Sequence, residues 1–175
     1  MGRRGTDPRP SVETNGIAIR RAGPADAPAI AEIWLRSFGA TYDFPPAHPD
    51  DDVRRWVRDE LVPTTETWVA VDEASARIVG FMALDADDLA QLYLDPGWLR
   101  RGIGSRLVSL AKARRPGGLG LYTFQANAGA RAFYERHGFR VVWFGDGSAN
   151  EERQPDLRYT WSPDPAPAPR PQAAR

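Results

Sequence analysis

The sequence contains no cysteine, and this absence narrows its chemistry more than any other feature of its composition. Disulfides, cysteine-ligated zinc and a thiol nucleophile are all excluded. The 23 basic and 23 acidic residues cancel, so no overall positive field gathers nucleic acid or an anionic membrane. The sequence also lacks an apolar run of membrane-spanning length and the apolar stretch of a signal peptide. We therefore expect a cytoplasmic protein without a nucleic-acid or membrane partner.

Lysine is nearly absent as well, because Lys112 is the only one and the other basic residues are arginines. This bias is typical of GC-rich bacterial genes and predicts a bacterial origin. The 175 residues suffice for one domain with its own core. Residues 1–15 are polar and carry two prolines, and residues 162–175 alternate proline with small residues. We expect both segments to be disordered, and residues 16–161 to form the folded domain.

Within this domain the hydrophobic spacing alternates between the period of strands and that of helices. Strands are predicted at 16–22, 66–73, 77–85, up to Leu94, at 119–124, 139–145 and 156–161. Helices are predicted after Pro24, from near Asp50, after Gly102 and after Asn127, where Asn127 is a candidate N-cap and Gly138 a candidate stop. This order predicts an α/β domain built around a mixed sheet.

The segment LYLDPGWLRRGIGS, from Leu92 to Ser105, leads from a strand into a helix through two glycines. Such a corner points free backbone N–H groups at one spot, where the helix dipole favours an anion. Gly102 and Gly104 allow close approach, and two arginines add positive charge. Nucleoside triphosphate loops end in GKS or GKT, which is missing here, and Leu107 stands where a dinucleotide fingerprint has its third glycine. A phosphate site and a simple packing device both stay open at this point.

A second motif, NAGARAFYERHGF, runs from Asn127 to Phe139. Together with LDPGWLRRGIG it resembles the two signature segments of the GNAT superfamily of N-acetyltransferases, which use acetyl-coenzyme A. The resemblance implies an α/β fold with a mixed central sheet of about seven strands flanked by about four helices. It also implies a splayed strand pair at the acetyl-coenzyme A site. One departure is Leu99, which stands where the family usually has Gln or Arg.

The resemblance also implies a role for individual residues. The backbone of the strand at Leu92, Tyr93 and Leu94 would bind the pantetheine arm, and Asn127 and Phe133 would contact the coenzyme. The pyrophosphate would lie on Arg100, Arg101, Gly102, Ile103, Gly104 and Ser105. Tyr134 would lie near the thioester sulfur and act as general acid, because a phenol can stabilise or protonate a departing thiolate. The alternative is that Tyr134 is a core aromatic residue of its helix.

The general base is not fixed by the resemblance, because Tyr122 stands where some relatives carry a glutamate. An amine acceptor has a pKa near 10.4 and must lose a proton before attack. The candidates are Asp88, His48, Asp51, Glu151 and Glu152. His48 lies between prolines and is otherwise a solvated loop residue, and the acidic run at 50–52 is more simply a helix start than a metal or amine site. No spacing indicates a metal.

The acceptor wall in this family is formed by the first two helices and the loop between the last strands, which offer Trp34, Phe38 and Tyr42, with Phe44 and Trp56. We therefore expect an acetyl-coenzyme A-dependent N-acetyltransferase that acts on the primary amine of a small molecule or peptide by direct attack in a ternary complex. Two alternatives remain, a catalytically silent acyl-coenzyme A-binding regulatory module and an unrelated phosphate-ligand binder. A homodimer is left open.

Overall fold

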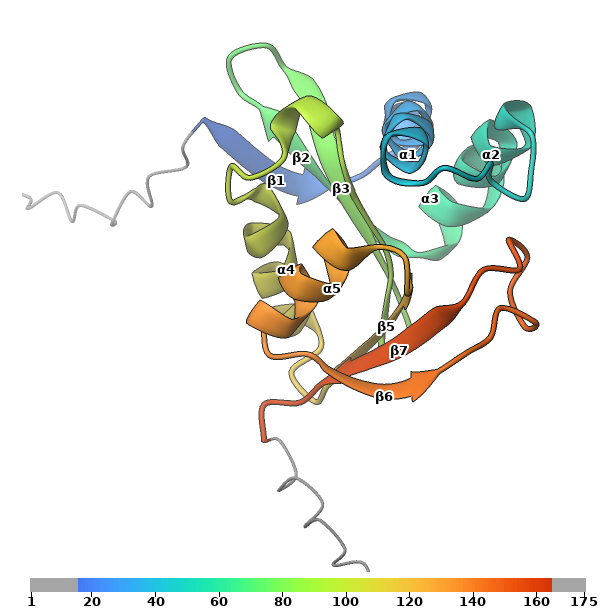
Figure 1. The fold of residues 1–175 in the computed structure, drawn as a ribbon. Helices are drawn as coiled ribbons and strands as arrows, with labels where there is room; N and C mark the ends of the chain where they lie inside the picture. The colour runs from blue at the N-terminus through green and yellow to red at the C-terminus, as the bar shows by residue number, and fades with distance from the viewer. Residues whose placement is uncertain (1–15, 165–175) are drawn as a thin grey trace, which may run out of the picture.

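The computed structural model describes residues 16–164, and the segments expected to be disordered lie outside this range except for residues 162–164. The described chain forms one seven-stranded mixed sheet with helices on both faces (Figure 1). The strands are β1 (Ile17–Arg21), β2 (Glu66–Asp72), β3 (Arg77–Asp85), β4 (Asp88–Leu94), β5 (Leu119–Phe124), β6 (Arg140–Phe144) and β7 (Asp156–Trp161). Their spatial order is β1-β2-β3-β4-β5-β7-β6. The predicted fold class is thereby confirmed.

The junction between β4 and β5 is the feature that positions the site. All other neighbouring strands are antiparallel, whereas β4 and β5 are parallel and are joined only where Asp88 lies opposite Gly120. On its other side β4 pairs with β3 along its length, with a register shift that leaves Ala90 between two paired residues. Such a bulge bends a strand and increases its twist. Beyond Asp88 the two strands diverge, which confirms the predicted splayed pair.

Two buried clusters lie on opposite faces of the sheet. On one face, α4 (Ile103–Arg114) and α5 (Ala128–Arg136) pack on strands from both halves of the sheet. On the other face, α1 (Ala27–Thr41) and α2 (Asp50–Trp56) pack on β2 and β3. Figure 1 shows these two helix pairs on either side of the sheet. The buried positions of α1 recur every three or four residues, so the helix packs on the sheet through one hydrophobic stripe.

Shorter helical segments join these elements. A 3-10 turn, η1 (Pro24–Asp26), precedes α1, and another, η3 (Pro96–Trp98), follows β4. After α2 the chain continues as a π turn, η2 (Val57–Leu61), and the short α3 (Val62–Thr64). The Val62 N–H donates to the Val57 carbonyl, which is the bond of a π turn, and Pro63 lacks the N–H that a regular helix needs.

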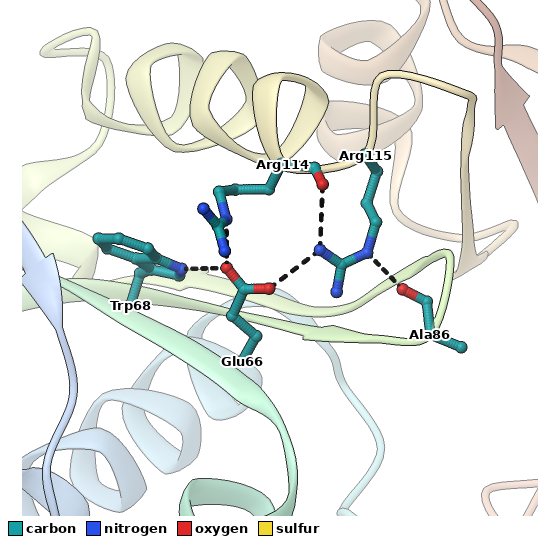
Figure 2. Close-up of polar contacts among 5 residues, drawn as sticks. All are labelled: Glu66, Trp68, Ala86, Arg114 and Arg115. Atoms are coloured by element: carbon teal, nitrogen blue, oxygen red, sulfur yellow. Dashed lines mark hydrogen bonds and ion pairs between the residues drawn. The ribbon is translucent and has the colours of Figure 1, made fainter.

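The C-terminal end of α4 is fixed to the sheet by Glu66 (Figure 2). The Glu66 carboxylate accepts hydrogen bonds from Arg114 Nε at 2.6 Å, Arg115 Nη1 at 2.9 Å and Trp68 Nε1 at 3.2 Å. Arg115 also donates to the Ala86 carbonyl in the turn between β3 and β4. Burial raises the pKa of Glu66, but the hydrogen bonds from the two arginines and Trp68 outweigh it and bring this pKa to about 2. One carboxylate that stays ionised therefore ties the C-terminal end of α4 to β2.

In the part of the chain that the structure describes, no helix combines the length and the apolar character needed to cross a membrane. The same residues contain no group of three or more His, Asp or Glu side chains arranged to hold a metal ion.

Candidate active site

A cavity of about 990 Å³ lies between the diverging strands β4 and β5. Its walls come from α1, the chain around α2, both strands, α5 and the loop between β6 and β7. Segments that are far apart in the sequence therefore meet at one place, where the sheet opens. An open sheet edge at the carboxyl ends of parallel strands is a common position for ligands.

The predicted phosphate corner is built from unusual backbone. Arg100 has φ +60° and Gly102 has φ +77°, and α4 starts directly after them. The first helical bond of α4 runs from the Arg106 N–H to the Gly102 carbonyl, so the N–H groups of residues 103–105 have no partner inside the helix. No side chain caps this end. An uncapped N-terminus with a left-handed entry offers convergent N–H donors, and its donor set fits a pyrophosphate.

The side chains around this corner show how it is supported. The Arg101 guanidinium stacks on the Trp98 ring, 4.6 Å from its centroid, and Leu99 is 54% exposed. Gly104 is buried, and a Cβ placed there would lie 3.2 Å from Phe133 Cζ. Gly104 is therefore a packing position as well, because it lets α5 approach α4. Phe133, predicted to bind the coenzyme, packs against this glycine.

The strand predicted to bind the pantetheine arm has one open edge. Leu92, Tyr93 and Leu94 pair with β3 on one side, and no β5 residue pairs with them on the other. Unpaired N–H and C=O groups of a strand edge suit an extended amide chain, which is the chemistry of pantetheine. The Tyr93 ring is held 5.8 Å from both Phe81 and Trp34.

Tyr134 lies at the inner wall of the cavity. Its side chain comes from α5, is only 8% exposed and packs against Phe133, Phe139 and Tyr159. Burial raises the pKa of the phenol, and Tyr42 raises it further. No hydrogen bond between residues 16 and 164 involves the Tyr134 hydroxyl. Tyr134 therefore occupies the position of a core aromatic residue and also brings a polar hydroxyl group to the cavity wall.

Asn127 holds α5 in place at the same wall. Its side-chain oxygen accepts from the Ala130 N–H at 2.9 Å, which confirms the predicted N-cap, and its amide nitrogen donates to the Tyr42 hydroxyl at 2.9 Å. Burial raises the pKa of Tyr42, and the hydrogen bond from Asn127 partly opposes this. The predicted coenzyme residue Asn127 thus connects α5 to the segment after α1.

The structure separates the candidates for the general base. Asp88 does not reach the cavity, because Arg158 binds both its oxygens at 2.8 and 2.6 Å where β4 meets β5. Asp51 pairs with Arg54 on the surface of α2. His48 and Glu151 both line the cavity although they are 103 residues apart, and His48 Nε2 lies 3.1 Å from Glu151 Oε2.

Glu152 also lines the cavity and is half-buried. Within residues 16–164 no hydrogen bond or ion pair engages its carboxylate. Its charge contributes, after burial, to the raised pKa values of Tyr42 and Tyr93. Glu152 is therefore the carboxylate of this cavity whose charge acts on the phenols of Tyr42 and Tyr93.

The predicted acceptor residues form one aromatic wall. The rings of Trp34 and Phe38 stack at 5.0 Å, and Tyr42 follows at 4.8 Å from Phe38. Trp56 and Phe124 also line the cavity, and Phe44 packs on this wall 5.5 Å from Phe124. Sequence reasoning missed Gln91, which lies next to the bulge of β4 and accepts a hydrogen bond from Trp34 Nε1 at 3.2 Å. The sequence signal that could have identified Gln91 is its position in the strand that leads directly into the segment from Leu92 to Ser105.

The cavity wall is also more acidic than the chain as a whole. Its carboxylates are those of Asp52, Asp59, Glu60, Glu151, Glu152 and Asp156. Arg55 is the one arginine among the lining residues in the described part of the chain, and His48 is the one histidine. Asp52 pairs with Arg55, which leaves an excess of negative charge. From this set the sequence analysis named Glu151 and Glu152 as candidate bases and interpreted Asp52 as part of a helix start, whereas it did not name Asp59, Glu60 and Asp156, which come from separate elements.

Comparisons with known proteins agree with this geometry. A family model described as "Acetyltransferase (GNAT) domain" matches residues 63–141. The chain is 34% identical over 125 residues to the peptidyl-lysine N-acetyltransferase YiaC of Escherichia coli, covering 71% of this chain and 84% of that protein.

Solved structures of acetyltransferases are similar to the fold of this chain as well. The solution structure of apo-form YjaB from Escherichia coli is similar with a TM-score of 0.69 and 31% identity, covering 82% of this chain and 96% of that one. The PaiA N-acetyltransferase of Thermoplasma acidophilum, solved in complex with coenzyme A, shares the fold with a TM-score of 0.62 and 20% identity, covering 83% of this chain and 98% of that one. Because the motifs, the splayed sheet and these relatives agree, the chain belongs to the GNAT family of N-acetyltransferases.

Proposed function

We propose that this protein transfers an acetyl group from acetyl-coenzyme A to the primary amine of a cationic acceptor, a lysine side chain of a peptide, by direct attack in a ternary complex. The observation that carries the acceptor class is the excess of carboxylates on the wall of a cavity that opens between β4 and β5. An ammonium group is attracted to such a wall before it loses its proton. The relative YiaC is named a peptidyl-lysine N-acetyltransferase, and this name supports the same acceptor class.

The coenzyme would lie along the open edge of β4, with its pyrophosphate on the N–H groups at the start of α4. When bound, acetyl-coenzyme A supplies the thioester carbonyl that the amine attacks. A backbone N–H of β4 near Leu92 to Leu94 would donate to the carbonyl oxygen as negative charge develops on it. Arg100 and Arg101 would add positive charge at the pyrophosphate.

Tyr134 would donate a hydrogen bond to the departing thiolate. Because burial raises its pKa, the phenol stays protonated at neutral pH and is a weaker acid than a thiol of pKa near 8.5. Stabilisation by a hydrogen bond is therefore favoured over complete proton transfer. This refines the role of general acid that the family resemblance implies.

The acceptor would lose its proton to the pair formed by His48 and Glu151. A carboxylate only accepts hydrogen bonds, so His48 Nε2 carries its proton toward Glu151 and Nδ1 of a neutral ring is left to accept one. Both side chains are exposed, at 55% and 73%, so the proton can pass on to solvent. Glu152 would hold the incoming ammonium group.

Mass spectrometry of a lysine peptide after incubation with acetyl-coenzyme A tests this proposal. We expect acetylation of the lysine side chain with equimolar thiol release, and none on a matched peptide with arginine in place of lysine. We also expect Glu152→Gln to raise KM for the peptide more than KM for acetyl-coenzyme A. Binding of coenzyme without transfer to any amine would instead identify a silent acyl-coenzyme A-binding module.

A further inference from the structure

His137, at the C-terminal end of α5, bridges the two helices that flank the phosphate corner. Its Nδ1 lies 2.8 Å from the Phe133 carbonyl oxygen on its own helix, and its Nε2 lies 3.0 Å from Ser105 Oγ in the first turn of α4. The Phe133 ring packs on the imidazole at 4.3 Å and on Gly104. Ser105 is thus held by a titratable group that belongs to a different element.

The partners of the ring determine where its proton lies. A carbonyl oxygen only accepts, so Nδ1 carries a hydrogen, and Nε2 of the neutral ring must then accept from the Ser105 hydroxyl. In this state the hydroxyl proton of Ser105 is directed at His137. When the ring is protonated, Nε2–H donates to Ser105 Oγ instead, and the hydroxyl proton becomes free to donate elsewhere.

The other charged groups near the ring make no hydrogen bond to its nitrogens in the part of the chain that the structure describes. From α4, the Lys112 ammonium donates to the His137 carbonyl rather than to the ring. From α5, the charged neighbours are Glu135, which accepts from Tyr159, and the exposed Arg136. Within residues 16–164 no carboxylate bonds either ring nitrogen, so the added charge of an imidazolium has no internal anion to neutralise it.

We propose that His137 is a positioning residue of the coenzyme site, which turns the Ser105 hydroxyl toward the pyrophosphate when its imidazole is protonated. The inference rests on the proposed function, because it takes the pyrophosphate to lie at the N-terminus of α4. A pyrophosphate oxygen needs donors, and the freed Ser105 hydroxyl adds one beside the backbone N–H groups of residues 103–105. The anion and the proton on His137 therefore favour each other, and this coupling is reciprocal.

Calorimetric titration with dephospho-coenzyme A tests the proposal without a catalytic readout. This ligand keeps the pyrophosphate but lacks the phosphate monoester, which itself titrates near pH 6. We expect the wild-type Kd to be about fivefold lower at pH 6 than at pH 8. His137→Gln keeps a hydrogen-bonding group for Ser105 but does not titrate in this range, so its Kd should be nearly constant between the two pH values.

Two further variants separate positioning from general effects. Ser105→Ala removes only the hydroxyl and should also abolish the pH dependence, with the loss of affinity concentrated at pH 6. His48→Gln removes the other histidine of the chain and should keep the wild-type pH profile of binding. Thermal unfolding at both pH values shows that each variant is folded.

The outcomes are distinguishable. Strong binding with the same pH dependence in wild type, His137→Gln and Ser105→Ala would overturn the positioning role and leave the proposed function intact. A pH dependence that disappears with His48→Gln would overturn it as well. No binding of dephospho-coenzyme A at either pH, together with no acetyl transfer, would overturn the proposed function and this inference with it.

Discussion

Replacement of Tyr134 by Phe tests whether its hydroxyl group serves catalysis or whether the residue serves only the fold. The substitution removes one hydroxyl and keeps the ring, which fills its place among Phe133, Phe139 and Tyr159. No hydrogen bond within the described residues is lost with this hydroxyl. We therefore expect the melting temperature to stay within about 2 °C of the wild type, since polar groups without protein partners contribute little to stability.

Turnover should fall much more. A hydrogen bond to a developing thiolate is charge-assisted, and its removal is expected to lower kcat by about ten- to a thousandfold. At about 1.4 kcal/mol per tenfold change, this corresponds to roughly 1.4 to 4 kcal/mol of transition-state stabilisation. Because the interaction strengthens only as the thiolate leaves, the affinity for acetyl-coenzyme A should change by no more than about threefold. Thiol release with a saturating acceptor, together with calorimetric binding, measures both quantities.

Tyr159→Phe is the matched control. This second buried tyrosine lies 6.1 Å from the Tyr134 ring, donates to Glu135 Oε1 at 2.7 Å and does not line the cavity. Its variant should lose about 1 kcal/mol of stability and retain its turnover, which is the opposite pattern. Normal turnover in Tyr134→Phe, or equal catalytic losses in both variants, would refute the assigned role of Tyr134.

Four further substitutions test the supporting structure and the phosphate corner. Glu66→Gln should lower the free energy of unfolding at pH 7 by about 2–3 kcal/mol, because the folded-state pKa of about 2 lies below the ordinary value of 4.5. The ionised carboxylate stabilises the fold above pH 4.5, and this contribution disappears as the pH falls to about 2. In urea unfolding, the difference in unfolding free energy between wild type and variant should therefore be smaller at pH 3 than at pH 7. The same difference at both pH values would contradict the pairing of Glu66 with the arginines. Gly104→Val should destabilise by about 1–3 kcal/mol, because its side chain would meet Phe133, and a wild-type melting temperature would exclude this packing. Arg100→Ala and Arg101→Ala should weaken coenzyme binding less at 500 mM salt than at 50 mM salt, whereas equal losses at both salt concentrations would speak against contact with phosphate.

Much of the local structure followed from the sequence, because strands, caps and turns depend on residues close together in the chain. The predicted strands at 77–85, 119–124 and 156–161 agree with the bounds of β3, β5 and β7. Asn127 caps α5 and Gly138 adopts φ +78° at its end, as their residue types predicted. The strand-to-helix corner at Gly102 and the membership in the GNAT family could also be predicted, because both are indicated by short motifs in the sequence.

The tertiary structure decided which of these residues act together. The sequence alone leaves Asp88 as a candidate base, whereas in the structure Arg158, 70 residues away, binds both its oxygens. His48 and Glu151 meet across 103 residues, and neither segment has a periodicity that predicts the other. The spacing of residues in a sequence indicates only contacts between residues that are close together in the chain. These contacts between distant residues instead depend on the order in which the strands pair and on the divergence of β4 and β5.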